Sequence, residues 1–236
     1  MKSLNCPNCG AAISAQLAKL DVVTCEFCNT SFRIPKTNTP EADMGDLILG
    51  ADFSSNIMPG WEFLNQDKLK FHKGNPNEVR AVFSTLPNKI HYVLKSSGLL
   101  DDFDASVTMR FTEGDEKMLR AGAYLRFSDL GGYTFLVSAI STYQVGVFTK
   151  DKDGNLVWKA IINWTLHTAL RAGLNQNNRL RVICDGDQFR LYLNGVLATS
   201  FKDSTISVGP FYLAVDPYST VDAVFAFSDL QVREVK

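Results

Sequence analysis

The stretch DASVTMRF at residues 104–111 decides the fold of most of this chain. Ala105, Val107, Met109 and Phe111 alternate along it with more polar side chains. Alternation with a period of two is typical of a β-strand that buries one face and leaves the other to solvent. We therefore predict a strand here that packs on a core through these four side chains.

Similar patterns lie on both sides of this stretch. Further strands are predicted over residues 121–127, 133–140, 143–149, 179–184, 189–193, 211–215 and 221–232. In the first of these we expect Ala123, Leu125 and Phe127 to face inward. Turns are predicted at residues 131–132, 153–155, 185–187 and 194–195, which are rich in Gly, Asn and Asp. Only residues 165–172 suggest a short helix. Short strands at this spacing predict an antiparallel β-sandwich of the jelly-roll type.

The size and composition of the chain fit one such domain and a small module. It has 236 residues, of which 45% are hydrophobic and 21% charged, and its net charge is −1. There is enough apolar material for a core but no overall basic field for nucleic acid or an anionic membrane. We divide the chain into a module at 1–35, a polar linker at 36–46 and a β-sandwich at 47–236. Neither a secretory signal nor an apolar run of membrane-spanning length is evident, so we expect a cytoplasmic protein.

Four of the five cysteines form two Cys-x2-Cys pairs near the N-terminus, namely Cys6 with Cys9 and Cys25 with Cys28. Each pair makes a tight turn that aims two sulfurs at one point, and two such turns complete the tetrahedron of a Zn²⁺ site. We predict one structural zinc ion, which stabilises a module too small to have an adequate core. Two disulfides or a redox pair are the alternatives. Four thiolate ligands leave no open position for a catalytic water.

The segments CPNCGAAI and TCEFCNTSFRI resemble the zinc ribbons that begin many bacterial multidomain proteins. Some ribbons bind nucleic acid, but here Asp21 and Glu26 partly balance the few basic residues. We therefore do not expect nucleic acid as a partner and interpret the ribbon as a structural element or a protein contact.

Residues 46–236 resemble the concanavalin A-like lectin/glucanase superfamily, which includes laminin-G-like and 3-keto-disaccharide-hydrolase-type domains. The resemblance is carried by the segments ADFSSNIMPGW, DFDASVTMRF, AGAYLRFSDLGGYTFLV, NRLRVICDGDQFRLYLNGVLATSF, VGPFYLAV and AVFAFSDLQV. It implies carbohydrate binding or glycan hydrolysis. It also makes a Ca²⁺ ion conceivable at residues 151–155, where we favour a plain hairpin turn.

Residues for hydrolysis are harder to find. Glycosidases of this fold carry carboxylates at alternate positions of one strand, and two carboxylates are needed. Residues 113–116 (EGDE) contain a glycine after a strand end, so we interpret them as a turn. Asp101, Asp102 and Asp104 are interpreted as a solvated entry to a strand, and Cys184 as a buried thiol. The three histidines lie far apart in the sequence. We find no catalytic constellation.

Exposed aromatic rings are the other way to bind a sugar, which stacks on them. Trp158 and Trp164 flank an apolar tripeptide and are candidates to line a groove, with core packing as the alternative. Tyr218 follows Asp-Pro in an expected loop, and Trp61 is expected in the core. We predict a non-catalytic binding module whose partner is a protein, a glycan or a second copy of the chain. A hydrolase of the 3-keto-disaccharide type is the alternative.

Overall fold

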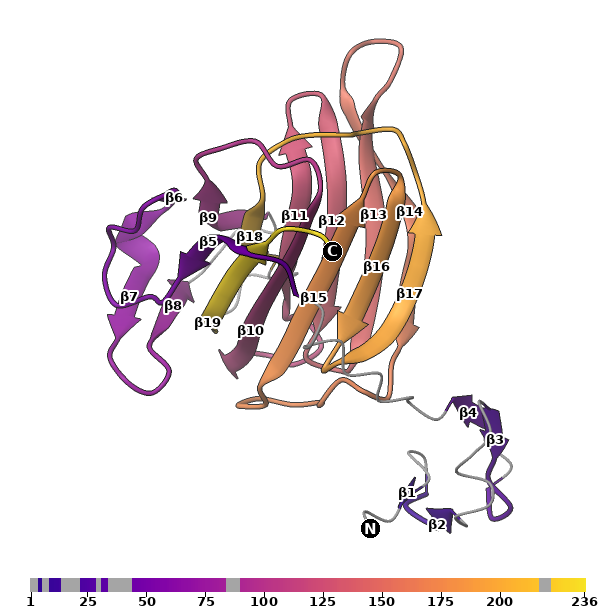
Figure 1. Cartoon of the computed structure of the whole chain (residues 1–236). Helices are drawn as coiled ribbons and strands as arrows, with labels where there is room; N and C mark the ends of the chain where they lie inside the picture. Colours follow the sequence, from indigo (N-terminus) through magenta and orange to yellow (C-terminus); the bar gives the residue numbers. More distant parts are fainter. Residues whose placement is uncertain are drawn as a thin grey trace.

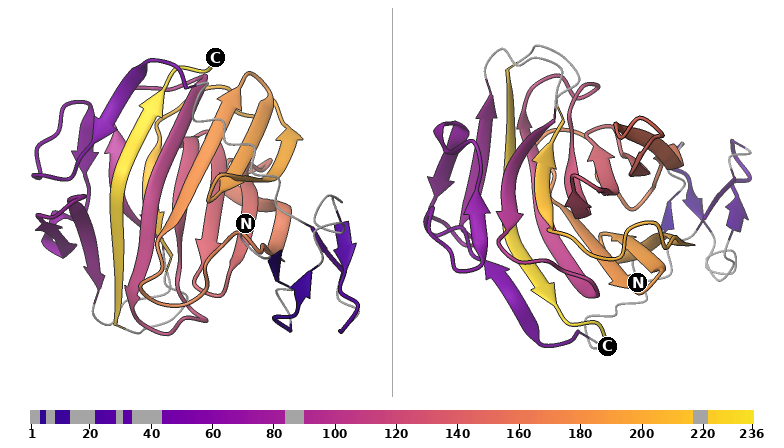
Figure 2. Two further views of the ribbon diagram at one scale, coloured as in Figure 1. Left: turned by 60° about the horizontal axis from the view of Figure 1, so that its bottom comes forward. Right: turned by 90° about the horizontal axis from the view of Figure 1, so that it is seen from above.

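The computed structural model describes residues 4–5, 9–13, 22–28, 31–33, 44–83, 90–216 and 222–236. Its architecture is nearly all β, and no α-helix occurs in these described ranges. Two antiparallel sheets are stacked as curved layers of a jelly-roll sandwich, as the sequence predicts (Figure 1, Figure 2).

One layer, here called the β10 sheet, has eight strands. Its order is β17 (Val196–Lys202), β16 (Gln188–Leu193), β15 (Asn178–Asp185), β10 (Phe103–Glu113), β19 (Ala223–Arg233), β8 (Glu78–Phe83) and β7 (Leu69–His72). The eighth strand, β5 (Leu47–Ala51), pairs with the end of β19. The backbone N–H of Glu234 also donates to the carbonyl of Asp46 at 2.9 Å, so the first and last parts of this domain lie side by side.

The other layer, here called the β12 sheet, has seven strands. Its order is β14 (Leu156–Leu166), β13 (Thr142–Lys150), β12 (Gly131–Ser138), β11 (Arg120–Ser128), β18 (Tyr212–Val215), β9 (His91–Ser96) and β6 (Trp61–Phe63). A short 3-10 turn at Gln66–Lys68 connects β6 to β7. Four short strands form two separate pairs nearer the N-terminus: β1 (Leu4–Asn5) with β2 (Ala12–Ile13), and β3 (Val22–Thr24) with β4 (Ser31–Arg33).

The main core lies between the two large sheets. Ala105, Val107, Met109 and Phe111 of β10 are all buried in it, which confirms the alternation that the sequence shows. Trp61 is also buried there, as expected. Burying this many apolar side chains is the main source of stability for such a sandwich, at about 25 cal/mol for each Å² removed from water.

Two local predictions are wrong. Residues 165–172 do not form a helix: β14 continues to Leu166, and a turn closed by Leu170 N–H to His167 O follows. Gly131 and Gly132 begin β12 instead of forming the turn, which lies one pair earlier in the chain. Close packing explains the glycines, because a Cβ on Gly131 would lie 2.3 Å from the carbonyl oxygen of Phe148.

The inward position of Phe127 is a third error. β11 has a register shift between Leu125 and Ser128, and Arg126 in that bulge has a φ of 50°. Since a bulge reverses the alternation that follows it, Arg126 turns inward and is only 1% exposed. Phe127 lies on the opposite face of the β12 sheet, where it joins a second apolar cluster.

Candidate functional site

The N-terminal cysteines form a cluster suited to a metal. The Sγ atoms of Cys9, Cys25 and Cys28 all lie within 4.8 Å of one another, and Cys9 Sγ is 3.7 Å from Cys25 Sγ. Zinc–sulfur bonds of about 2.3 Å in a tetrahedron place two sulfurs about 3.8 Å apart, so this spacing fits thiolate ligands of zinc. The 3.7 Å between the sulfurs of Cys9 and Cys25 is much longer than a disulfide bond of about 2.05 Å. Cys6, the fourth predicted ligand, lies outside the described residues.

The outer face of the β12 sheet carries a cluster of aromatic side chains. Ala121, Ala123 and Leu125 of β11 point into the main core, so the residues between them point to the other side of the sheet. There a second apolar cluster forms, separate from the core. The six rings of this cluster, here called the aromatic face, belong to Tyr92, Tyr124, Phe127, Phe148, Trp164 and Tyr212.

Several rings of the aromatic face contact one another edge to face. The centroids of Tyr92 and Tyr124 lie 5.4 Å apart at an interplanar angle of 87°, and those of Tyr124 and Phe127 lie 5.0 Å apart at 89°. Such T-shaped contacts are favourable and hold the rings in place. Tyr124 is buried beneath its neighbours, whereas Tyr92, Phe127 and Tyr212 are half-buried and offer part of their surface to solvent. The face is therefore a preformed, partly accessible apolar platform.

Charged groups border the platform where β11 begins and β18 ends. The guanidinium of Arg120 lies over the Trp164 ring, with its carbon 4.8 Å from the centroid. Asp216 follows β18, and its backbone N–H donates to the carbonyl of Arg120 at 2.8 Å. Burial raises the pKa of the Asp216 carboxyl above its ordinary value, and the positive charge of Arg120 lowers it in part. A cation and a carboxylate thus flank the aromatic rings, as a site for a polar ligand with an apolar face requires.

Trp158 extends the platform along β14. Its indole Nε1 lies 3.3 Å from the hydroxyl of Thr134, to which it donates. The ring lies directly on Gly146, because a Cβ on that residue would come within 2.2 Å of the indole Nε1. Trp158 is 37% exposed, so part of this ring is open to a ligand.

Desolvation also raises the pKa values of the phenols. Burial is the main cause for Tyr92, whose pKa rises to about 12, with a smaller contribution from Tyr212. Burial likewise raises the pKa of Tyr212. Both side chains are therefore neutral at physiological pH and can donate or accept hydrogen bonds through their hydroxyl groups.

The central strands of the β12 sheet carry no carboxylate on this face. The residues of β11, β12 and β13 that lie on this face are Arg120, Gly122, Tyr124, Phe127, Gly132, Thr134, Leu136, Ser138, Thr142, Gln144, Gly146, Phe148 and Lys150. The acidic tetrapeptide at 113–116 begins at the end of β10 and turns away from the strand, as predicted. Among the residues described here, Asp216 and Glu62 are carboxylates beside the aromatic face, and the charge of Glu62 adds to the raised pKa of Tyr212.

The two predicted tryptophans thus lie on one face, whereas Tyr218 falls outside the described residues. The other members of the aromatic face were not predicted as ligand-binding residues. Tyr124 and Phe148 occupy positions that are typical of any β-strand. The alternation in the sequence predicts that Phe127 lies in the core. The bulge at Arg126 that turns Phe127 outward has no clear signal in the sequence.

Two further predictions concern acidic residues. Asp104 is only 5% exposed and pairs with Arg181, whose Nε donates to Asp104 Oδ1 at 2.8 Å, so its assignment as a solvated residue is wrong. Opposite charges across neighbouring strands β10 and β15 explain its burial. In the hairpin at 151–155, Asp151 Oδ1 accepts from the N–H groups of Asp153 and Asn155, so these residues form the predicted hairpin turn. Cys184 is fully buried, as predicted.

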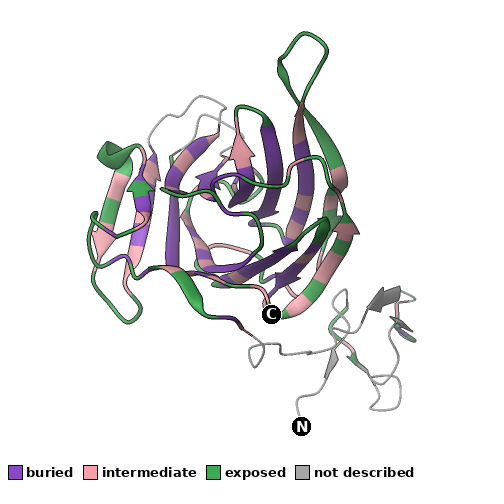
Figure 3. Ribbon diagram, turned by 45° about the horizontal axis from the view of Figure 1, so that its top comes forward, coloured by how far each residue is buried: buried purple, intermediate pink, exposed green. Residues whose placement is uncertain are grey.

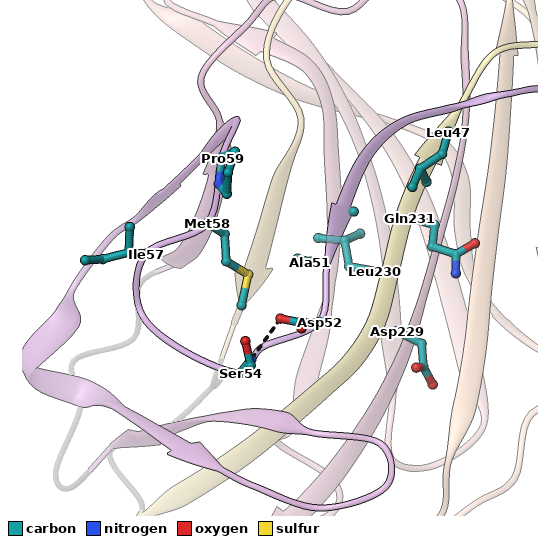
Figure 4. Close-up of a pocket in the computed structure, with 11 residues that line it drawn as sticks. Leu47, Ala51, Asp52, Ser54, Ile57, Met58, Pro59, Asp229, Leu230 and Gln231 are labelled. Atoms are coloured by element: carbon teal, nitrogen blue, oxygen red, sulfur yellow. Dashed lines mark hydrogen bonds between the residues drawn. The ribbon is translucent and has the colours of Figure 1, made fainter.

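A groove of about 500 Å³ lies elsewhere, between β5, the end of β19 and the loop after β5 (Figure 4). Its walls include the aliphatic side chains of Leu47, Ile57 and Leu230. Asp52 lies at one wall and is held by the N–H of Ser54 at 3.0 Å. No aromatic residue lines this groove, so it lacks the stacking surface of the aromatic face.

Comparisons with solved structures match the sandwich to proteins of the same fold. It is similar to the carbohydrate-binding module CBM66 from Bacillus subtilis, with a TM-score of 0.54 and 19% identity over 74% of this chain and 96% of that one. It is also similar to a glycoside hydrolase family 16 endo-glucanase from Bacteroides ovatus, with a TM-score of 0.60 and 8% identity over 79% of this chain and all (100%) of that one. The sandwich therefore has a concanavalin A-like jelly-roll fold.

A third neighbour is the receptor-binding domain of botulinum neurotoxin type G, with a TM-score of 0.53 and 10% identity over 81% of this chain. The match covers 49% of that domain, so this chain spans about half its length. No family model and no curated protein matches the sequence. At such low identities the structural likenesses establish the fold alone. Among the described residues, no helix is long and apolar enough to span a membrane.

Proposed function

We propose that the sandwich binds a glycan without catalysis through the aromatic face and Trp158. The observation that carries this proposal is the half-buried ring platform bordered by Arg120 and Asp216. Sugar rings have apolar C–H faces that stack on aromatic side chains and hydroxyl groups that bond to charged and polar neighbours. The fold shared with a carbohydrate-binding module supports the same proposal.

The N-terminal module would hold one structural zinc ion through Cys9, Cys25, Cys28 and Cys6. The sulfur spacing supports this assignment for the three described cysteines. Zinc would supply folding energy to a segment too short for an adequate core, and it would leave the module as a stable contact surface for a protein partner. We also propose that the chain divides into a ribbon, a linker and a sandwich. We further propose that the protein is cytoplasmic.

A glycan array followed by calorimetry tests the ligand. Trp164→Ala removes a ring from the platform and should weaken binding of the best array ligand by about tenfold or more. Leu197→Ala is the matched control, because Leu197 is a part-exposed residue on the edge strand of the other sheet. A silent array, or equal affinities for both variants and the parent, would count against this site.

Hydrolysis is the second candidate, and Asp216 is the observation that favours it. A carboxyl with a raised pKa beside a sugar platform has the property of a general acid. Incubation of the array ligand with the protein and chromatography of the products separates the two functions. If the protein cleaves the ligand and Asp216→Asn abolishes this cleavage, the sandwich is an enzyme and the proposal of binding without catalysis is wrong.

A further inference from the structure

The edge of the β12 sheet formed by β14 differs from the other sheet edges. β14 has 11 residues, whereas the edge strands β6, β7 and β17 have three, four and seven. Within the described part of the chain, β14 pairs only with β13, so its other side presents unpaired backbone groups. Proteins usually keep such edges short or charged, because a long free edge pairs readily with another strand.

The side chains of β14 do little to block pairing. Lys159 is its only charged residue, and the strand contains no proline. Leu156 and Leu166 at its two ends are 39% and 69% exposed. Figure 3 shows the contrast with the buried central strands, since β14 carries exposed and intermediate residues along its length.

The sequence of β14 is nearly symmetric. It reads LVWKAIINWTL, and equal distances on either side of Ile161 hold residues of like kind. The matched pairs are Leu156 with Leu166, Val157 with Thr165, Trp158 with Trp164, Lys159 with Asn163 and Ala160 with Ile162. An antiparallel pair of identical strands centred on this residue would place each residue opposite its match.

We propose that two copies of this chain associate through β14, antiparallel and about a two-fold axis at Ile161. Trp158 then lies opposite Trp164 of the partner subunit, and aromatic cross-strand pairs are favourable. Lys159 lies opposite the partner's Asn163, so the lysines of the two copies are not opposite each other and do not repel. This complementarity identifies a second copy as the occupant of the edge.

The bulges in β14 keep its two tryptophans on one face of the sheet. Between the pairs Tyr143–Thr165 and Gly146–Ala160, β14 has two more residues than β13, one at each register shift. Two single-residue bulges reverse the alternation twice, so Trp158 and Trp164 remain on the same face of the sheet. A two-fold axis perpendicular to the sheet then places the aromatic faces of both copies on one side of a continuous sheet. Such a pair would bind a polymer at two points and gain avidity.

Sedimentation of the full chain over a range of concentrations tests the proposal. We expect a monomer–dimer equilibrium. Asn163→Lys places a lysine opposite Lys159 of the partner subunit twice in each dimer, and should weaken dimerisation by about tenfold. Asn163→Glu places a carboxylate there and should strengthen it by a similar factor. Asn163 is exposed, so neither variant disturbs the core.

Asn177→Lys and Asn177→Glu are matched controls, since Asn177 is exposed in a loop away from β14. They should leave the dimerisation constant unchanged. A chain that stays monomeric at all concentrations overturns the proposal. A dimer that responds equally to both Asn163 variants, or to neither, also overturns it, because the register predicts opposite effects. Sedimentation needs no ligand, so failure here is distinguishable from failure of glycan binding.

Discussion

The guanidinium carbon of Arg120 lies 4.8 Å from the centre of the Trp164 ring. This contact joins β11 to β14 across the two strands between them, β12 and β13. A cation over an aromatic face is worth about 0.5–1 kcal/mol at a part-exposed site, and it fixes the orientation of the ring. Arg120 therefore both positions the Trp164 ring and supplies hydrogen-bond donors at the border of the aromatic face.

Replacing Arg120 should reduce ligand binding. Arg120→Met keeps an unbranched side chain but removes the charge and the donors, and we expect about tenfold weaker glycan binding by calorimetry. Arg120→Lys keeps a cation and should lose less, because a lysine lacks the planar fork of arginine. Equal affinities for the Met and Lys variants would show that the charge has no part in binding.

Asp216 should make stability depend on pH. Because burial raises its pKa in the folded state above the ordinary 3.8, the folded protein holds this proton more tightly than the unfolded chain does. The contribution is therefore favourable at low pH and is lost as the pH rises from about 3.8 through the raised pKa. Asp216→Asn should raise Tm at pH 7 by roughly 2 °C and have little effect near pH 3.5. A Tm difference that is the same at both pH values would contradict this assignment.

The sequence was sufficient for the fold because alternation and turn chemistry are local. Residues 104–111 show their buried face directly, and the turn at 153–155 forms where its residues favour it. The candidate site depends on features that are not local. The position of Phe127 follows from a bulge whose Arg126 is held by carbonyls from distant loops. The pairing of Arg120 with Trp164 depends on strand order, which no sequence pattern here specifies.

Arg126 should be essential for stability. Its Nε donates to the carbonyl of Asp101 at 2.7 Å, and its Nη1 donates to the carbonyls of Gly186 and Ile206 at 3.0 and 3.2 Å. Arg126→Met would leave these carbonyls without their donor, and we expect a loss of about 3 kcal/mol and a fall in Tm of about 10 °C.

Arg190→Met is the matched control for that measurement. Arg190 is 38% exposed in its side chain, and its nitrogen lies 3.8 Å from Asp185, so its removal should cost less than about 0.5 kcal/mol. Denaturation by heat and by urea would give both values. Similar losses for the two variants would mean that the loop carbonyls find other donors.

The zinc assignment predicts a selective loss of metal. Cys25→Ser should reduce the zinc content from one per chain to none or nearly none, whereas Cys184→Ala should leave it at one. Burial raises the pKa of the Cys184 thiol, so this residue should also resist alkylation while the sandwich is folded. Elemental analysis and mass spectrometry after iodoacetamide, with and without a chelator, measure both effects. Alkylation of the N-terminal cysteines at full rate before chelation would argue against bound zinc.

Gly146 should control the position of the Trp158 ring. A Cβ at this residue would lie 2.2, 2.4 and 2.6 Å from three atoms of the indole, so Gly146→Ala must displace the ring from the sheet. We expect Gly146→Ala to weaken glycan binding about as much as Trp158→Ala, by about tenfold, and to shift tryptophan fluorescence. Gly50→Ala is the control, because its Cβ would make only an ordinary 3.5 Å contact with Leu47. Gly146→Ala could shift the fluorescence and leave glycan binding intact, while Trp158→Ala weakens glycan binding. That result would show that binding needs the Trp158 ring on this face but does not need its fixed position on Gly146.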